Sequence, residues 1–266
     1  MSSVNSFCFG VVTPTFNRPE LLKRAIESVI HQTYQNWVMI IVDDCSTEDY
    51  GFISEFLADN RIIYFKNNIN SGVNYCRNEA LIKLEEIGCD YITFLDDDDY
   101  IVTPNTFSNV LGDISSYPDA DWYIYDVINY SETNNKDYPI VMERIDYIND
   151  YLYGNKLLGD KHHFINSNIA KNIRFSSFIR NGFEWTYFIQ FANVKTLYIS
   201  KPAKVIEYQE AGLTQVGQKK KPRNIILQTA LPTFVWFRRP KQMKAFRRMV
   251  TLSLKLPFRL IISLFR

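Results

Sequence analysis

Short apolar runs alternate with helix-forming segments along the first part of this sequence, and that alternation restricts the fold more than any other feature. Strands are predicted from four short runs, at residues 7–12, 37–42, 62–65 and 91–95. The continuous β-branched run at 37–42 is typical of a strand buried on both faces, and 91–95 is predicted as another buried strand. Helices are predicted between them from apolar residues spaced by three and four, at residues 19–30, 48–58 and 74–87. Because parallel strands are joined by helical crossovers, the sequence predicts an α/β protein with a mostly parallel sheet flanked by helices.

The regular alternation weakens after Pro104. Further elements are predicted as strands near residues 122–127, 164–165 and 194–199 and as a helix at 184–192. We therefore expect one α/β domain over residues 1–215, with halves at 1–104 and 105–215, followed by a distinct segment at 216–266.

Polar residues follow three of the predicted strands, at the positions where each strand ends. Residues 13–18 read TPTFNR and include Pro14, which lacks a backbone N–H and is expected to end the first strand. Asp43 and Asp44 follow the second strand, and an unbroken run of aspartates at 96–99 follows the fourth. In open parallel sheets ligands bind beyond the carboxyl ends of the strands, so these clusters mark the expected site.

The aspartates at 96–99 repel one another, and a bound divalent cation would remove that repulsion. Mg²⁺ and Mn²⁺ bind one or two protein carboxylates together with phosphate oxygens and water. Side chains two residues apart in an extended segment point the same way, so Asp96 and Asp98 are expected to reach one ligand while Asp97 and Asp99 face elsewhere. The alternative is a solvated acidic turn.

Asp43 and Asp44 occupy the same place at the end of a neighbouring strand. A carboxylate there can accept hydrogen bonds from a base imide or a ribose hydroxyl, whereas the alternative is an Asx turn or a helix cap. Taken together, the three polar strand ends predict a site for a nucleoside diphosphate.

The order and spacing of four motifs resemble glycosyltransferase family 2, whose members have the GT-A (Rossmann-like) fold. The motifs are TPTFNR at 13–18, VDDCST at 42–47, NSGVNYCRN at 70–78 and FLDDDD at 94–99. The resemblance covers residues 5–215 and implies a nucleotide-sugar donor bound over the first half of the sheet, with Mn²⁺ or Mg²⁺ as cofactor. Cys76 departs from the family, in which alanine is commoner at this position, but a small buried thiol is expected to fit.

The resemblance also implies roles for individual residues. Asp44 is expected at the base and Arg77 near the nucleotide. Asp98 is the expected metal ligand, with Asp96 as the second. Contacts with the nucleotide sugar are implied for Thr13, Pro14, Thr15, Asn17, Arg18, Asp43, Asp44, Asn74, Arg77, Asp96 and Asp97.

Inverting members of the family take their catalytic base from a Glu-Asp pair at the start of a helix in the second half, and Phe183 and Glu184 occupy these two places here. No other acidic residue lies between Asp160 and Glu207, so Glu184 is expected among aromatic neighbours. Apolar surroundings raise the pKa of a carboxyl group toward the range useful for deprotonating a sugar hydroxyl. The alternative is a first-turn glutamate that stabilises the helix N-terminus.

These features predict an inverting glycosyltransferase that moves a sugar from a nucleoside-diphosphate donor, expected to be a UDP-sugar. The expected acceptor is a hydroxyl of a glycan or of a polyprenyl-diphosphate-linked sugar, in the synthesis of bacterial surface polysaccharide such as capsule or O-antigen. One alternative is a sugar nucleotidyltransferase, although the Gly-rich basic phosphate loop typical of that class is missing near the N-terminus. The other alternative is a non-catalytic scaffold that binds nucleotide sugars.

The histidines have weaker assignments. His31 ends a predicted helix, where a cation is favourable. His162 and His163 are expected in a loop, and an approach to the diphosphate or to the acceptor is the alternative. Tyr208 and residues 212–214 resemble the closing segment of the family, which often carries a histidine that this chain lacks.

The charged residues divide the chain at Glu210, the last acidic residue. Residues 1–210 hold 17 basic and 29 acidic side chains, whereas residues 211–266 hold 13 basic and none acidic. From Arg238 onward basic and apolar residues recur at helical spacing, which predicts a basic amphipathic helix, kinked at Pro257, on an anionic membrane surface. An interface between copies of the chain is the alternative, and nucleic acid is not an expected partner because phosphate binding needs no apolar stripe.

The remaining features concern location. The four cysteines are scattered and the N-terminus has no basic segment followed by an apolar run, which favours a reducing cytoplasm. The apolar segment at 249–265 contains Lys255, Pro257 and Arg259, so it makes a poor spanning helix. We expect a cytoplasmic protein bound peripherally to the inner face of the plasma membrane.

Overall fold

The computed structural model describes residues 6–130, 139–152, 156–177, 179–207, 226, 230 and 243–264. The chain forms two compact units. One comprises Met1–Ile145 and Gly159–Glu207, and the other comprises Asp146–Leu158 and Tyr208–Arg266. All of the expected site residues lie in the first of these, the larger unit. Tyr208 and residues 212–214 lie outside the described residues.

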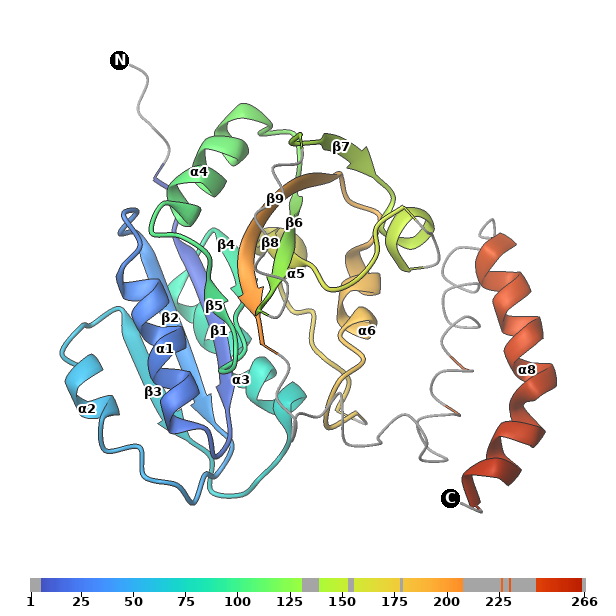
Figure 1. Ribbon diagram of the computed structural model, residues 1–266, viewed down its shortest axis with the longest axis horizontal. Helices are drawn as coiled ribbons and strands as arrows, with labels where there is room; N and C mark the ends of the chain where they lie inside the picture. Colours follow the sequence, from blue (N-terminus) through green and yellow to red (C-terminus); the bar gives the residue numbers. More distant parts are fainter. Residues whose placement is uncertain are drawn as a thin grey trace. The chain divides into compact units, whose positions relative to one another are not determined.

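The larger unit is built on one sheet with the strand order β3-β2-β1-β4-β8-β6-β9-β5, and β7 pairs with β9 (Figure 1). The strands β3, β2, β1 and β4 run parallel, whereas β8 pairs antiparallel with both β4 and β6. The α/β class is therefore confirmed, with a parallel first half and a mixed second half. The bounds are β1 Phe9–Thr15, β2 Trp37–Asp43, β3 Ile62–Lys66, β4 Tyr91–Phe94, β5 Tyr100–Ile101, β6 Trp122–Asn129, β7 Met142–Ile145, β8 His162–Asn166 and β9 Thr196–Ile206.

Helices cover both faces of the parallel half. Phe9 of β1 is in one core cluster with Leu22 and Ile26, which belong to the apolar face of α1. Gly10 points to the opposite face, where an added Cβ would come within 2.7 Å of the Leu84 side chain of α3. The helices of this unit are α1 Pro19–Ile30, α2 Ile53–Phe56, α3 Val73–Ile87, α4 Thr106–Ser116, α5 Ser167–Ala170 and α6 Trp185–Phe188.

β1 continues through Pro14, so the expectation that this proline ends the strand is wrong. Thr15 accepts a hydrogen bond from the N–H of Asp44, and Val12 accepts one from the N–H of Leu95. Residues of a strand bond alternately to the two neighbouring strands, so Val12 and Pro14 face β4 whereas Thr15 faces β2. The nitrogen of Pro14 therefore points toward β4, and pairing with β4 has stopped at Val12. The proline is tolerated because its missing N–H is not needed there.

Several other elements differ from the prediction. The helix expected at 48–58 is shortened to α2, and the one expected at 184–192 is α6 followed by a 3₁₀ turn, Ile189–Phe191. The elements β5, β7 and α4 were not expected. α4 had a detectable signal, because Phe107, Val110 and Ile114 recur at helical spacing and are buried.

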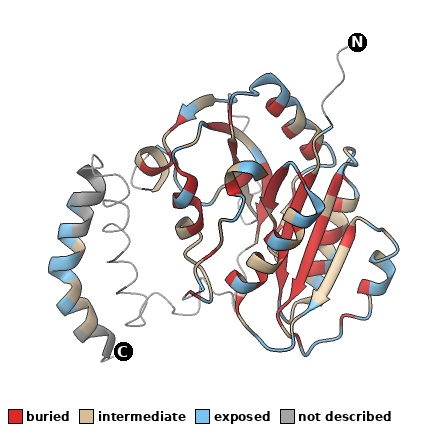
Figure 2. Ribbon diagram, turned by 180° about the vertical axis from the view of Figure 1, so that it is seen from behind, coloured by how far each residue is buried: buried red, intermediate tan, exposed pale blue. Residues whose placement is uncertain are grey.

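Aromatic side chains fill much of the core of the larger unit. Phe9 contacts Phe107 and Phe164, with ring centroids 5.4 and 5.5 Å apart. Trp122 stacks on Phe188 at 5.5 Å. Figure 2 shows the burial concentrated along the central strands and on the inner sides of the helices. The high aromatic content of the sequence therefore serves core packing to a large extent.

In the smaller unit the structure describes a π-helix, Tyr147–Leu152, and the long helix α8, Met243–Leu264. The amphipathic helix expected in the C-terminal segment is present, and it runs without interruption through Pro257. Val250, Leu254 and Phe258 form an exposed apolar stripe on it, the last two with 72% and 70% of their surface accessible. In the described part of the chain, no helix is both long enough and apolar enough to cross a membrane.

Candidate functional site

The carboxyl ends of β1, β2 and β4 meet at one side of the sheet. We call this region, defined by Asp43, Asp44 and residues 96–99, the acidic edge. The strand register explains why these residues lie together. Thr15 of β1 lies opposite Asp43 of β2, and Val12 of β1 lies opposite Phe94 of β4, which shortly precedes the aspartates. The structure therefore brings together the three polar strand ends that the sequence placed far apart.

The aspartates after β4 alternate in exposure as expected. The side chains of Asp96 and Asp98 are 37% and 21% exposed, whereas those of Asp97 and Asp99 are both 8% exposed. Asp96 and Asp98 are thus the two carboxylates of the run that a ligand can reach most easily.

The buried side chain of Asp97 is hydrogen-bonded to two residues of the TPTFNR motif at 13–18. Its Oδ2 accepts a hydrogen bond from Thr15 Oγ1 at 2.8 Å, and its Oδ1 accepts one from Arg18 at 3.2 Å. Thr15 Oγ1 also shares a hydrogen bond with the Tyr50 hydroxyl, which the sequence did not single out. Burial and the charge of Asp98 outweigh these bonds and raise the pKa of Asp97 to about 7.

Asp98 faces Arg18, whose guanidinium donates to Asp98 Oδ2 at 2.7 Å. Burial, followed by the charge of Asp96, raises the pKa of Asp98 in spite of that contact. Burial lowers the pKa of Arg18 while Asp97 and Asp98 raise it, and the pKa rises overall. The effects of burial and of Asp96 on Asp98 therefore outweigh the opposing effect of Arg18.

Asp99 forms an ion pair with Lys204 of β9, which the sequence analysis missed. Lys204 Nζ lies 2.6 Å from Asp99 Oδ2, and the two side chains are 11% and 8% exposed. Burial raises the pKa of Asp99 to about 6, although Lys204 opposes the shift. Burial also disfavours charged Lys204, but Asp99 and Asp96 raise its pKa overall. A lone lysine in a strand gives no sequence signal for this pairing.

Arg77 of α3 joins the two halves of the site. Its buried guanidinium donates to Asp96 Oδ1 at 2.8 Å and to Glu184 Oε1 at 3.0 Å. Burial disfavours charged Arg77, yet Asp96 and Glu184 raise its pKa above the usual value. The same arginine lowers the pKa of Asp96, where its charge overcomes the effect of burial. Arg77 therefore holds Glu184, the expected base, close to Asp96, which is expected to bind the metal and the nucleotide sugar.

Glu184 is not in the apolar setting that the sequence analysis expected. Its side chain is 46% exposed, and Oε1 accepts the hydrogen bond from Arg77. Glu184 does stand at the N-cap of α6, but its side chain makes no capping hydrogen bond. The aromatic residues that follow it, Tyr187 and Phe188, turn into the core instead. The position of Glu184 beside the acidic edge, and not an apolar environment, is what supports a catalytic part for it.

The first turn of α3 holds the loop that carries Glu184. Asn74 donates through Nδ2 to the carbonyls of Ile179 and Gly182 at 2.9 and 3.1 Å, and its own N–H donates to the carbonyl of Arg180. Gly72 has φ +96°, and an added Cβ would come 2.7 Å from the Arg180 carbonyl oxygen. Asn74 therefore supports the loop at residues 179–182 through hydrogen bonds to its carbonyl groups.

The other polar strand end is bonded mainly within its own loops. Asp43 is fully buried and accepts from Ser46 N and the Tyr64 hydroxyl, both at 2.7 Å. Asp44 accepts from the backbone N–H groups of Ser71 and Gly72, also at 2.7 Å. For Asp43 this is the Asx-turn alternative, and Asp44 orders the loop before α3.

Three more of the residues expected to contact the nucleotide are bonded to other loops of the protein or buried in β1. Asn17 adopts φ +54° and accepts from Thr47 N at 2.7 Å, so it joins the loops after β1 and β2. Thr13 is buried, and among the described residues its Oγ1 has no hydrogen-bond partner. Pro14 is buried in β1 beside it.

The paired histidines are structural, and the loop expected for them is a strand. His162 and His163 lie buried in β8. His162 Nε2 shares a hydrogen bond with Thr93 Oγ1 at 2.9 Å, and Trp122 donates to His163 Nδ1 at 3.2 Å. Burial, with the charges of Lys204 and Lys161, lowers the pKa of His163 to about 3, and the pKa of His162 is also well below its usual value. His31 is the C-cap residue of α1, as expected.

The residues of the acidic edge fit a divalent cation that a ligand helps to bind. Within the described ranges, no group of three or more His, Cys, Asp or Glu side chains is arranged to hold a metal by itself. Mg²⁺ and Mn²⁺ commonly use one or two carboxylates and complete their shell with phosphate and water. Asp96 and Asp98 supply two such carboxylates, and their side chains are the two most exposed of the run.

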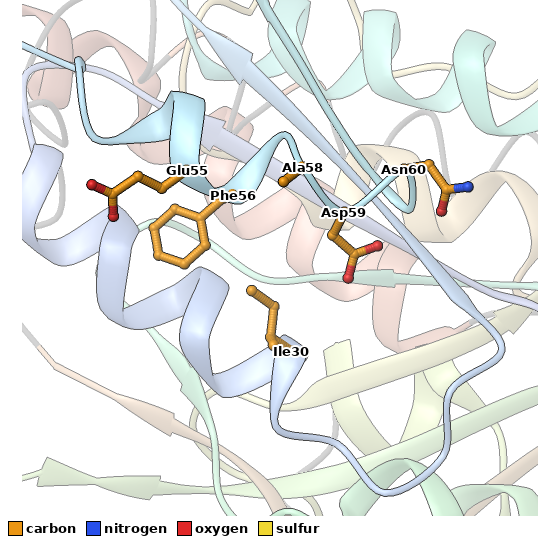
Figure 3. A pocket seen from close by; sticks show the side chains of 6 residues that line it. All are labelled: Ile30, Glu55, Phe56, Ala58, Asp59 and Asn60. Carbon is orange, nitrogen blue, oxygen red and sulfur yellow. The ribbon is translucent and has the colours of Figure 1, made fainter.

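A separate pocket lies between the end of α1 and the loop after α2 (Figure 3). It is at the end of α1 opposite Arg18, so it is not part of the acidic edge. The lining residues are Ile30, Glu55, Phe56, Ala58, Asp59 and Asn60.

The chain belongs to glycosyltransferase family 2, because the model of the family described as glycosyl transferase family 2 matches residues 10–180. That stretch contains three parallel strand ends with their motifs, although it stops before Glu184.

Two curated relatives match part of this region. The putative colanic acid biosynthesis glycosyl transferase WcaA of Escherichia coli strain K12 is 46% identical over 106 residues, which are 39% of this chain and 37% of that protein. The UDP-Glc:alpha-D-GlcNAc-diphosphoundecaprenol beta-1,3-glucosyltransferase WfaP of Escherichia coli is 41% identical over 94 residues, which are 35% of this chain and 36% of that protein. The matched region thus spans little more than a third of each relative.

Two solved structures share the architecture. Staphylococcus aureus TarS 1-349 in complex with UDP-GlcNAc has a TM-score of 0.73 at 16% identity, over 94% of this chain and 72% of that chain. The mannosyltransferase PcManGT from Pyrobaculum calidifontis in complex with GDP-Man and Mn²⁺ has a TM-score of 0.56 at 13% identity, over 96% and 72%. These likenesses establish the GT-A fold of this chain.

Proposed function

We propose that this protein is an inverting glycosyltransferase that transfers a sugar from a UDP-sugar to a hydroxyl of a glycan or lipid-linked acceptor in bacterial surface polysaccharide synthesis. The observation that carries the proposal is the bridge made by Arg77, which holds Glu184 and Asp96 together at the acidic edge. Membership of family 2 supports the reaction class. The names of WcaA and WfaP support the polysaccharide and lipid-linked acceptor, and the UDP-GlcNAc complex of TarS supports the donor.

The donor would bind across the ends of the parallel strands. The nucleoside would lie over Thr13, Pro14 and Thr15, with Asp44 at the base and Arg77 and Arg18 near the diphosphate. Three further residues would support the site without touching the donor, because their side chains hydrogen-bond to the loops around it: Asn17, Asp43 and Asn74.

Asp98 and Asp96 would hold Mn²⁺ or Mg²⁺. Such an ion, when bound, neutralises charge on the diphosphate leaving group. The Mn²⁺ named with PcManGT supports manganese for a protein of this fold. Arg18, bonded to Asp98, and Lys204, paired with Asp99, add positive charge at this edge, and charges held in place by such contacts require little reorganisation during the reaction.

Glu184 would act as the general base. It takes the proton of an acceptor hydroxyl, and the oxygen then forms a bond to the anomeric carbon of the donor sugar. The bond between that carbon and the diphosphate oxygen breaks, and its electron pair leaves with the diphosphate. Arg77 positions the carboxylate for this step by holding Oε1 and leaving the other oxygen for the acceptor.

Glu184→Gln tests the assignment of the base. Transfer should fall by about 10²–10⁴-fold, because the amide cannot accept the proton, while the Kd for UDP-sugar stays the same. Glu85→Gln is the matched control, since Glu85 also pairs with an arginine, Arg174, and lies on the same helix as Arg77. Calorimetry of UDP-GlcNAc binding and a UDP-release assay measure the two quantities. Full transfer by Glu184→Gln would move the base elsewhere.

The stereochemistry tests the mechanism. Attack from the face opposite the diphosphate gives a product whose anomeric configuration is the reverse of that in the donor. NMR of the product reports the configuration directly, and retention of the donor configuration would contradict a single displacement.

The C-terminal segment is proposed to hold the enzyme on the inner face of the plasma membrane. α8 exposes Val250, Leu254 and Phe258, and Arg247 and Lys255 are exposed on the same helix. Each basic residue near anionic headgroups contributes about 1 kcal/mol. Leu254→Ser with Phe258→Ser should release the protein from phosphatidylglycerol vesicles in a flotation assay, and so should deletion of 236–266. Unchanged flotation of both would favour an interface between copies of the chain.

A further inference from the structure

Two aromatic residues flank Glu184 in the chain, and they lie outside the core. The rings of Phe183 and Trp185 meet edge to face, with centroids 6.2 Å apart and planes at 78°. Both residues are only partly buried, whereas Tyr187 and Phe188, next along the chain, are buried. Among the described residues, each of the two rings contacts no aromatic ring except the other. Phe183 and Trp185 therefore form a partly exposed corner, which we call the aromatic corner.

The backbone at Phe183 is strained to keep this arrangement. Phe183 has φ +61°, in the left-handed region that a bulky side chain rarely adopts. Two of the other three non-glycine residues with positive φ are Asn17 and Asn172, a residue type that tolerates the region. Strain of this kind persists where surrounding contacts enforce it, and it concentrates at functional sites.

The contacts that enforce the strain are present. Thr186 donates to the Phe183 carbonyl through both its N–H and its Oγ1, each at 2.8 Å. On the other side, Asn74 holds the carbonyl of Gly182 at 3.1 Å. The backbone of the loop is thus fixed by hydrogen bonds that do not depend on the Phe183 ring. Glycine would satisfy the same bonds without strain, so the ring itself is the feature to be explained.

We propose that the aromatic corner binds the pyranose ring of the acceptor, with the sugar's C–H face against one ring and its edge against the other. The inference rests on the proposed function, because it takes Glu184 as the base. Glu184 is the residue between the two aromatics in the chain and its side chain is 46% exposed, and in the proposed arrangement a sugar held by the two rings presents a hydroxyl to its carboxylate. Aromatic faces suit such a ligand, since a pyranose offers a flat patch of C–H groups, and the indole N–H of Trp185 adds a hydrogen-bond donor.

Phe183→Gly is the decisive variant, because it removes the ring and relieves the strained φ together. Saturation-transfer NMR measures binding of the methyl glycosides of glucose and N-acetylglucosamine to the full chain in the presence of UDP and Mn²⁺. We expect the apparent Kd of the bound glycoside to rise about tenfold in Phe183→Gly, a loss near 1.4 kcal/mol, while Tm is unchanged or higher. A purely structural role of Phe183 predicts a lower Tm and an unchanged Kd.

Trp185 supplies the second set of variants. Trp185→Ala should weaken the same glycoside by a similar factor, and Trp185→Phe should restore part of the binding because it keeps an aromatic face. Tyr117→Ala is the matched control, since Tyr117 is a partly exposed aromatic at the end of α4. The inference is overturned if neither glycoside binds the wild-type chain, or if Phe183→Gly and Trp185→Ala both bind like wild type.

Different measurements test the proposed glycosyltransferase function and the sugar-binding role of the aromatic corner. If UDP-GlcNAc does not bind the wild-type protein, or Glu184→Gln retains full transfer, the proposed function fails. If donor binding is normal in Phe183→Gly and Trp185→Ala, and glycoside binding is also normal, only the aromatic corner is refuted. Donor titrations on the same samples separate these cases.

Discussion

Two acidic clusters stand at the carboxyl ends of β2 and β4, the parallel strands on either side of β1, and their carboxylates have different partners. Asp43 and Asp44 accept hydrogen bonds mainly from neutral groups of nearby loops, among them backbone N–H groups and the Tyr64 hydroxyl, and the half-exposed Lys66 places its Nζ 3.8 Å from Asp43 Oδ2. The aspartates at 96–99 instead face charged side chains brought from far along the chain. The first arrangement orders loops, and the second balances charge at a site.

The pKa values of the second cluster show how incomplete that balance is. Asp97 reaches about 7 and Asp99 about 6, mainly because burial disfavours their charged forms. Three basic residues, Arg18, Arg77 and Lys204, already contact this cluster. Asp97, Asp98 and Asp99 keep raised pKa values beside these cations, mainly because they are buried, whereas Asp43 and Asp44 are hydrogen-bonded within their loops.

The strongest test of this contrast is Asp98→Asn. We expect transfer to fall by about 10³-fold, because a carboxylate that would hold the cation is lost. The Tm should stay the same or rise, since the variant removes repulsion from a carboxylate whose pKa is already raised. Steady-state UDP release and a thermal melt measure both. Activity within tenfold of wild type would remove Asp98 from the site.

A second test concerns charge balance inside the fold. Lys204→Met leaves Asp99 buried without its cation and should lower the free energy of unfolding by about 3 kcal/mol. Adding Asp99→Asn to this variant should recover most of the loss, because the uncompensated charge is gone. Urea denaturation of both variants gives the values. Equal stability of Lys204→Met and wild type would show that Asp99 takes up a proton without cost.

The smallest effect is expected in the first cluster. Asp43→Asn leaves either Ser46 N or the Tyr64 hydroxyl without an acceptor, and should lower stability by about 1–3 kcal/mol. Donor KM should be unchanged, because the Asp43 side chain is fully buried. If donor affinity falls while stability is kept, Asp43 touches the nucleotide and the contrast between the clusters is wrong.

Local sequence patterns predicted the parallel half of the fold well. Continuous β-branched runs such as residues 37–42 have few other uses than a doubly covered strand, and β2 follows that run closely. The same patterns predicted where these strands end, and so the sequence alone predicted that the polar clusters of the acidic edge lie together. Pro14 was misjudged because its tolerance depends on where β4 stops pairing, which is a tertiary property.

The second half of the site was less predictable, since its partners are distant in the sequence. Lys204 meets Asp99 across 105 residues, and nothing near either residue announces the pair. The same holds for Glu184, whose aromatic neighbours in the sequence predicted an apolar environment. In three dimensions Tyr187 and Phe188 turn inward and Arg77 reaches the carboxylate. The strand predicted near residues 164–165 is β8, but it begins two residues earlier, so His162 and His163 belong to the strand and not to the loop expected before it.

The close approach of Gly72 to the carbonyl of Arg180 has a consequence for recombining this chain with its relatives. Any chimera that takes the parallel half from one parent and the loop that carries Glu184 from another must bring these two positions together again. A parent with a side chain at position 72 would push the Arg180 carbonyl away and displace Glu184 with it. Chimeras of this kind should therefore fold only between parents that both have glycine at this N-cap of α3.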